Sequence, residues 1–324
     1  MSSAAVCIGH TILYWDAILI ALSACACYLA IFSAYTANGG RAGTLCVFVP
    51  LSLALAVGVS RLMFWLCHPE QFASLSAAFL PGSGGSVCLS GVVIGFALAA
   101  ALLRLLRLAP DAALLFDSCA PGLALGLALV RLSALFNGSC RGKLVITDPR
   151  FARLPFAAPA PGAAEYRFAA FFVSSLLFLA VFVIVTLLYL RLWGRPGDAF
   201  LVFLLLYNAV DMLIDSTRYD ATYFLFNGFV SVAQILGAVT MLGVTVLFSV
   251  RARRAGTTAK RRVLCWIVWF LGLGAAGVSE YLVQRHGNWP LRCYALMSFG
   301  LLLTLAAALL LYRPARKALR ERPL

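Results

Sequence analysis

Long apolar runs alternate with short polar segments along most of the 324-residue chain. Each run has roughly 20 residues, the length that an α-helix needs to cross a hydrocarbon core of about 30 Å, whereas barrel strands alternate over about ten residues. The runs predict nine membrane-spanning helices, at residues 11–35, 44–66, 85–108, 112–136, 165–190, 199–215, 229–250, 263–283 and 291–312. We therefore expect an all-α, polytopic integral membrane helix bundle with almost no soluble domain.

The composition agrees with lipid as the solvent, because 63% of the residues are hydrophobic and only 12% are charged. A soluble domain has about 45–50% apolar and about 25% charged residues. The net charge is +14, but the basic residues gather at the ends of predicted helices, so we expect no nucleic-acid partner. Nine spans with the N-terminus outside place the basic run 251–262 and the C-terminus in the cytoplasm, as the positive-inside rule requires.

The spans group into two predicted units. Residues 1–250 carry seven spans, and residues 251–324 carry a basic cytoplasmic loop, two further spans and a basic tail. The three histidines, His10, His68 and His286, lie far apart in sequence and have no ligand-spaced neighbours, so we expect no metal site and no cofactor.

The longest connection, residues 137–164, follows the fourth span on the predicted outer side. It carries Arg141, Lys143, Arg150 and Arg153 against one acidic residue, Asp148. A basic segment at a membrane surface attracts anionic lipid headgroups, although a merely solvated loop has the same composition.

Charged side chains within the spans cost about 2.5–3.5 kcal/mol each on insertion scales and indicate functional sites. Arg61 and Arg131 lie in the second and fourth spans. Asp211 and Asp215 lie four residues apart on one face of the sixth, and Arg218 follows. One interpretation is that these groups pair only to hold the helices together. The other is a polar cavity open to the outer leaflet, in which arginine binds phosphate through bidentate hydrogen bonds.

The fourth span also carries a recognisable sequence. The segment 120–126 (APGLALG), Arg131, the pair Asn137-Gly138 and Gly142 together resemble the signature of the prolipoprotein diacylglyceryl transferase family. Weaker matches in the same order occur at residues 58–62 (GVSRL), 90–95 (SGVVIG) and 207–218. The resemblance covers roughly residues 11–250, which is seven of the nine spans.

The resemblance implies a reaction, a location and partners. The family moves a diacylglyceryl group from phosphatidylglycerol to the lipobox cysteine thiol of a prolipoprotein. We therefore expect a multi-pass protein of the bacterial plasma (inner) membrane that binds phosphatidylglycerol or another anionic lipid and a prolipoprotein signal peptide. The residues expected to act in catalysis are Arg131, Asp211 and Asp215, and those expected to bind substrate are Arg61, Ser90, Asn137, Gly138, Arg141, Gly142, Lys143 and Arg218.

The sequence departs from the family pattern at two informative positions. Ser90 stands where the family has a histidine, and Asp211 stands where it has an arginine. A serine cannot accept a proton at neutral pH as histidine can, so Asp211 or Asp215 is the expected proton acceptor. Two alternatives stay open: a catalytically degenerate relative that binds lipid or lipoprotein, and a small-solute transporter, for which the sequence shows no inverted repeat.

Overall fold

The computed structural model describes residues 4–8, 11–72, 74–79, 88–109, 111–160, 165–190, 196–223, 230–286 and 290–320. The long helices are α1 (Trp15–Ala37), α2 (Ala42–Cys67), α4 (Leu89–Leu105), α5 (Ala112–Arg131), α8 (Ala170–Leu190), α9 (Asp198–Thr217), α10 (Val232–Arg254), α11 (Ala259–His286) and α12 (Pro290–Arg320). These helices occupy the nine predicted positions, so the prediction of an all-α polytopic membrane bundle is confirmed.

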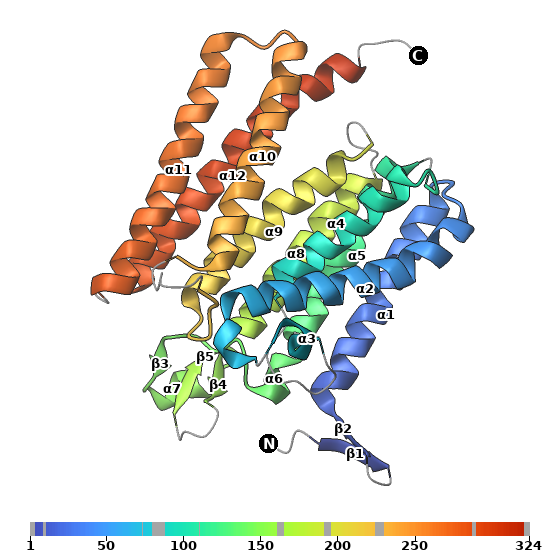
Figure 1. The fold of residues 1–324 in the computed structure, drawn as a ribbon. Coiled ribbons are helices and arrows are strands. Elements are labelled where there is room, and N and C mark those ends of the chain that lie inside the picture. Colours follow the sequence, from blue (N-terminus) through green and yellow to red (C-terminus); the bar gives the residue numbers. More distant parts are fainter. Residues whose placement is uncertain are drawn as a thin grey trace.

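Eight of the described helices are long and apolar enough to cross a membrane. The ninth, α4, has 17 residues, which corresponds to about 26 Å at 1.5 Å per residue. The first residues of the third and seventh predicted spans, 85–87 and 229, lie outside the described residues. The β-hairpin that precedes α1 and the end of α12 lie at opposite ends of the bundle (Figure 1), as an odd number of crossings requires. Which end is cytoplasmic stays a prediction.

Two predicted span boundaries are wrong. Residues 11–14 form a strand, β2 (Thr11–Tyr14), paired with β1 (Ala4–Ile8), and the first helix begins only at Trp15. Likewise β5 (Tyr166–Phe168) precedes α8. Both short segments are rich in β-branched or aromatic residues, which favour strands once a partner strand is available. An apolar run alone does not show where strand pairing ends and a helix begins.

The connection between the fourth and fifth spans is a folded cap. It contains the one-turn helix α6 (Ala134–Asn137), β3 (Val145–Ile146), α7 (Pro149–Ala152) and β4 (Ala157–Pro159). The strands form an antiparallel sheet in the order β3-β5-β4. In Figure 1 this cap lies at the same end of the bundle as the β1–β2 hairpin, below the ends of α9 and α10.

Small residues let neighbouring helices approach closely, as is common in membrane proteins. A Cβ atom added at Gly95 of α4 would lie 2.5 Å from Cα of Ala56 in α2. A Cβ at Gly122 of α5 would clash with the side chain of Ile31 in α1. These contacts fix α4 and α5 against their neighbours, and both helices carry polar residues to the capped end.

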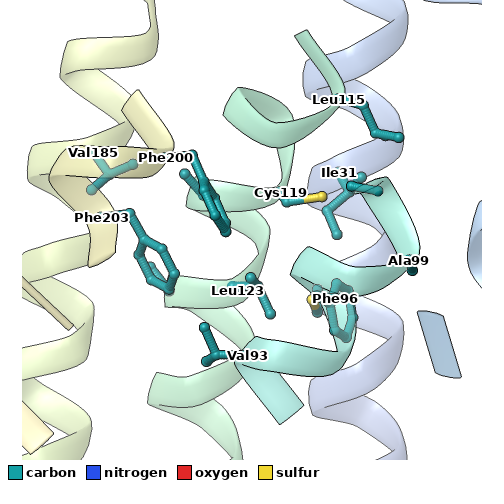
Figure 2. Packing of buried hydrophobic residues seen from close by; sticks show 14 of the residues in the cluster. Ile31, Val93, Phe96, Ala99, Leu115, Cys119, Leu123, Val185, Phe200 and Phe203 are labelled. Carbon is teal, nitrogen blue, oxygen red and sulfur yellow. The ribbon is translucent and has the colours of Figure 1, made fainter. Parts of the chain in front are cut away.

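Helix α9 joins two apolar cores. Phe200 and Phe203 pack with α1, α4, α5 and α8, as Figure 2 shows. Leu205 and Met212, on another face, pack with α10, α11 and α12. As a result α9 is the most buried of the eight spans. In its apolar stretch 72% of the residues are buried, and in that of α5 61% are. Polar groups on these two helices therefore lie inside protein rather than against lipid.

A short 3-10 turn, Pro69–Gln71, and the one-turn helix α3 (Leu75–Ala78) follow α2 at the capped end. Gln71 of the turn lines the cavity at this end of the bundle.

Candidate functional site

A cavity of about 580 Å³ lies at the capped end of the bundle. Its walls come from residues of α1, α2, α4, α5, α6, α9 and α10 and from the segments 139–140 and 218–222. The polar residues that line it are His68, Gln71, Ser90, Arg131, Ser133, Asn137, Ser139, Asp211, Asp215, Arg218, Asp220 and Thr222. A volume of this size accommodates a small molecule or a lipid headgroup with part of its chains.

The centre of the site is a buried ion pair between α5 and α9. Nη2 of Arg131 donates to Oδ1 of Asp211 at 2.8 Å, and each side chain is only 7% exposed. Tyr207, one turn earlier on α9, donates its hydroxyl to Oδ2 of Asp211 at 3.2 Å and lies 3.5 Å from the Ser90 hydroxyl of α4. Both oxygens of Asp211 are thus engaged by described residues.

Arg131 is less fully satisfied than its partner. Nη1 donates only to the weakly accepting Sγ of Cys140, at 3.6 Å, and Nε is buried with no hydrogen-bond partner among the described residues. Arg131 lines the cavity, so the N–H groups of Nη1 and Nη2 that the bonds to Cys140 and Asp211 do not use are able to bind an anionic oxygen there.

A second ion-paired group lies where α9 ends. Nη1 of Arg218 donates to Oδ1 of Asp215 at 3.2 Å, and its Nε donates to Oδ1 of Asp220 at 3.0 Å. The other Asp220 oxygen accepts the backbone N–H of Cys140 at 2.8 Å. Burial alone would raise the pKa of Asp220, but the charge and hydrogen bond of Arg218 hold it below the usual value. Oδ2 of Asp215 is buried and has no partner within the described structure.

Backbone pairing holds the segment 140–143 against the end of α9. The N–H of Lys143 donates to the carbonyl of Thr217 at 2.7 Å, and the N–H of Gly142 donates to the carbonyl of Phe168 at 2.7 Å. A Cβ atom at Gly142 would lie 2.8 Å from Cβ of Phe168, so only glycine fits this approach without a shift. Gly142 therefore lets the segment after α6 pack against Phe168 of β5 through its backbone.

The turn after α6 has the conformation that its sequence requires. Gly138 has φ +75°, in the left-handed region that favours glycine. Oδ1 of Asn137 accepts hydrogen bonds from the N–H and hydroxyl of Ser139, at 3.0 and 2.7 Å. Asn137 and Ser139 line the cavity, as does Cys140, which also has a positive φ of 54°.

Five predicted substrate-binding residues lie outside the set of described residues that line the cavity: the glycines Gly138 and Gly142, and the basic residues Arg61, Arg141 and Lys143. Arg141 donates to the carbonyls of Ala134 and Pro159, lies over the Phe171 ring, and has its pKa lowered by burial. Its position shows that it holds the cap together.

The basic residues Arg61 and Lys143 also face protein. Arg61 donates to the carbonyl of Ala78 at 3.0 Å and lies over the ring of Phe72. Nζ of Lys143 is buried, and desolvation lowers its pKa while the charge of Glu280 on α11 opposes that shift. Their role in binding substrate stays a prediction.

Sequence reasoning missed four residues of the site. Tyr207 and Asp220 complete the two ion-paired groups, Cys140 contacts Arg131, and His68 lines the cavity from the end of α2. Asp220 follows Arg218 by two residues, and this proximity of opposite charges in the sequence is a signal for the ion pair that they form. Nothing in the sequence places His68 in the same cavity as Arg131, because the two are 63 residues apart and only helix packing brings both to its lining.

Fold and site together define a multi-pass membrane protein with an arginine-bearing cavity at one end of its bundle. A family model described as prolipoprotein diacylglyceryl transferase matches residues 3–250. The match covers more than half of the chain, so the protein belongs to the prolipoprotein diacylglyceryl transferase family, as the resemblance in its sequence indicates. A comparison with curated proteins finds no match.

Proposed function

We propose that this protein transfers a diacylglyceryl group from phosphatidylglycerol to the lipobox cysteine of a prolipoprotein in the bacterial plasma membrane. The observation that carries the proposal is Arg131, which lines a cavity of about 580 Å³ in a chain of this transferase family and keeps N–H groups of Nη1 and Nη2 beyond its bonds to Cys140 and Asp211. The proposed unit for the reaction is residues 1–250, and residues 251–324 form the addition.

The chemistry needs a cationic group where the phosphate departs. As the glyceryl carbon–oxygen bond breaks, negative charge grows on the leaving glycerol phosphate. In the proposal Arg131 stabilises that charge through its free N–H groups, while Asp211 and Tyr207 hold the guanidinium in place. Arg218, fixed by Asp215 and Asp220, is the second cation of the cavity.

A reconstituted assay tests the proposal. Purified protein in vesicles that contain phosphatidylglycerol is given a lipobox peptide, and glycerol phosphate release and peptide mass are measured. Wild type is expected to release glycerol phosphate and to add a diacylglyceryl group to the peptide, and Arg131→Gln to lose about 10²–10³-fold in rate, as for other anion-stabilising donors. Arg41→Gln, at an exposed position before α2, is the matched control and is expected to leave the rate unchanged.

One observation favours the second candidate, a lipid-binding relative without catalysis. Two arginines of the cavity, Arg131 and Arg218, are each paired with aspartate, and three aspartates line the same cavity. If these pairs only join helices, the assay gives no glycerol phosphate from wild type, while phosphatidylglycerol still co-purifies with the protein. That combination would replace the proposed transfer with lipid binding.

A further inference from the structure

The imidazole of His68 is a feature of the cavity that the function above does not use. His68 is the residue after α2, and its side chain lines the same cavity as Ser90 and Arg131. Nδ1 lies 3.3 Å from Oε1 of Glu70 in the following 3-10 turn, and the ring packs against Phe64 with centroids 4.9 Å apart. A carboxylate on Nδ1 sets the tautomer in which Nε2 is free to accept a proton.

The carboxylates of the cavity are poor alternatives as proton acceptors. Both oxygens of Asp211 and both of Asp220 already accept hydrogen bonds. In Asp215, Oδ1 is bound by Arg218 and Oδ2 is fully buried, so a substrate thiol does not reach it without rearrangement. The His68 side chain, by contrast, is 27% exposed.

On this ground, and resting on the proposed function, we propose that His68 is the general base that takes the proton from the acceptor cysteine. Nε2 accepts the thiol proton as the sulfur attacks the glyceryl methylene carbon of the lipid. One carbon–sulfur bond forms, and the bond between that carbon and the phosphate oxygen breaks. Its electron pair leaves with glycerol phosphate, and the imidazolium returns its proton to water or to the product phosphate.

The charges around the cavity favour this transfer. Three carboxylates, of Asp211, Asp215 and Asp220, face two guanidinium groups, of Arg131 and Arg218, so the lining has one formal negative charge in excess. An imidazolium formed at His68 balances that excess, and Glu70 stabilises the same cation from the other side of the ring. Proton transfer from the thiol therefore produces the positive charge where the surrounding groups stabilise it.

The test uses His68→Ala in the reconstituted full-length protein, with His286→Ala, at the end of α11, as the matched histidine control. Removal of a general base costs typically 10²–10⁴-fold, so the rate of His68→Ala should fall by that factor and His286→Ala should match wild type. Imidazole added to the buffer should restore part of the His68→Ala rate. Retention of phosphatidylglycerol, measured by native mass spectrometry, should be unchanged.

The arms of the experiment separate this inference from the function that it rests on. An inactive wild type would overturn the proposed function, and the inference with it. An active wild type with a fully active His68→Ala would overturn the inference alone, and Asp215→Asn would then be expected to abolish transfer. A His68→Ala protein that loses phosphatidylglycerol and does not respond to imidazole would show a structural role and would also overturn it. Glu70→Gln is a milder test, with an expected loss on the order of tenfold because that carboxylate is largely exposed.

Discussion

Replacing Arg131 by methionine leaves Asp211 buried without its cation. Both side chains are 7% exposed and meet at 2.8 Å between α5 and α9, the two most buried spans. Removing one partner of such a pair typically costs about 3–5 kcal/mol, because the remaining charge is neither solvated nor paired. Arg131→Met and Asp211→Leu should therefore each lower the free energy of unfolding by about this amount.

The double variant should behave differently. An apolar pair in place of a buried ion pair is often neutral or stabilising. The one group left behind is the Tyr207 hydroxyl, which loses its 3.2 Å bond to Asp211 and keeps only Ser90 at 3.5 Å, at a cost of about 1–3 kcal/mol. Arg131→Met/Asp211→Leu should thus be destabilised by about 1–3 kcal/mol, far less than the sum of the two single changes.

Unfolding in mixed micelles with increasing denaturing detergent, followed by tryptophan fluorescence, measures all four proteins on one scale. The transfer assay runs on the same samples, and the double variant should stay inactive although its stability recovers. A double variant as unstable as the sum of the singles would refute the reasoning, since the two side chains would then act independently.

Three further predictions concern the cap and the added hairpin. Gly142→Ala should cost about 1–3 kcal/mol because its Cβ would lie 2.8 Å from Phe168, whereas Gly43→Ala, with open space, should change the unfolding free energy by less than about 1 kcal/mol in the same detergent titration. The lowered pKa of Asp220 means that its contribution to stability is present above its unfolded pKa and is lost as pH falls through the folded value. The stability difference between wild type and Asp220→Asn should therefore shrink below a pH of about 4. Glu280→Gln should lower the pKa of Lys143 further, as read from the ¹⁵N shifts of the lysine side chains, because Glu280 now opposes the effect of burial.

The sequence was sufficient to predict the helix bundle, because lipid requires a similar length and apolarity of every membrane-spanning helix. It was also sufficient to place Arg131, Asp211, Asp215 and Arg218 at one end, since each lies at the corresponding end of its helix. The pairing was predictable only in part: Arg131 pairs with Asp211, as one interpretation of the sequence expected. Asp215 instead binds the nearby Arg218, and Arg61 binds a backbone carbonyl. The rotation of each helix about its own axis decides which side chains meet. That rotation depends on the packing of residues throughout both apolar cores.

The folded cap shows a second limit. Composition suggested that Arg141 and Lys143 face lipid headgroups, whereas Arg141 is 2% exposed and binds carbonyls from α6 and β4. The cap closes through pairing of residues 142–146 with 166–168 and with 217–218, across separations of 20 to 76 residues. Arg150 and Arg153 of the same connection are exposed, as expected. A local count of charges carries no information on contacts at that distance, so it did not show which of the basic residues face protein.

The added hairpin of α11 and α12 supports the site through contacts with the last turn of α9 and with the segment that follows it. Tyr294 of α12 lies 3.5 Å from the carbonyl of Ser216, and Gln284 of α11 joins Tyr223 to Glu280, at 3.4 and 2.7 Å. Ser216 lies between Asp215 and Arg218, so these contacts support the turn that holds Arg218, the second cation of the cavity.

The family match ends at residue 250, yet the second apolar core binds α9 to α10, α11 and α12 together. A chain that ended after α10 would expose the apolar face of α9 that carries Leu205 and Met212, and the two aspartates would lose the rigid helix that places them. The residues beyond the family match therefore belong to the structural support of the site, even though they contribute no side chain to the lining of its cavity in the described structure.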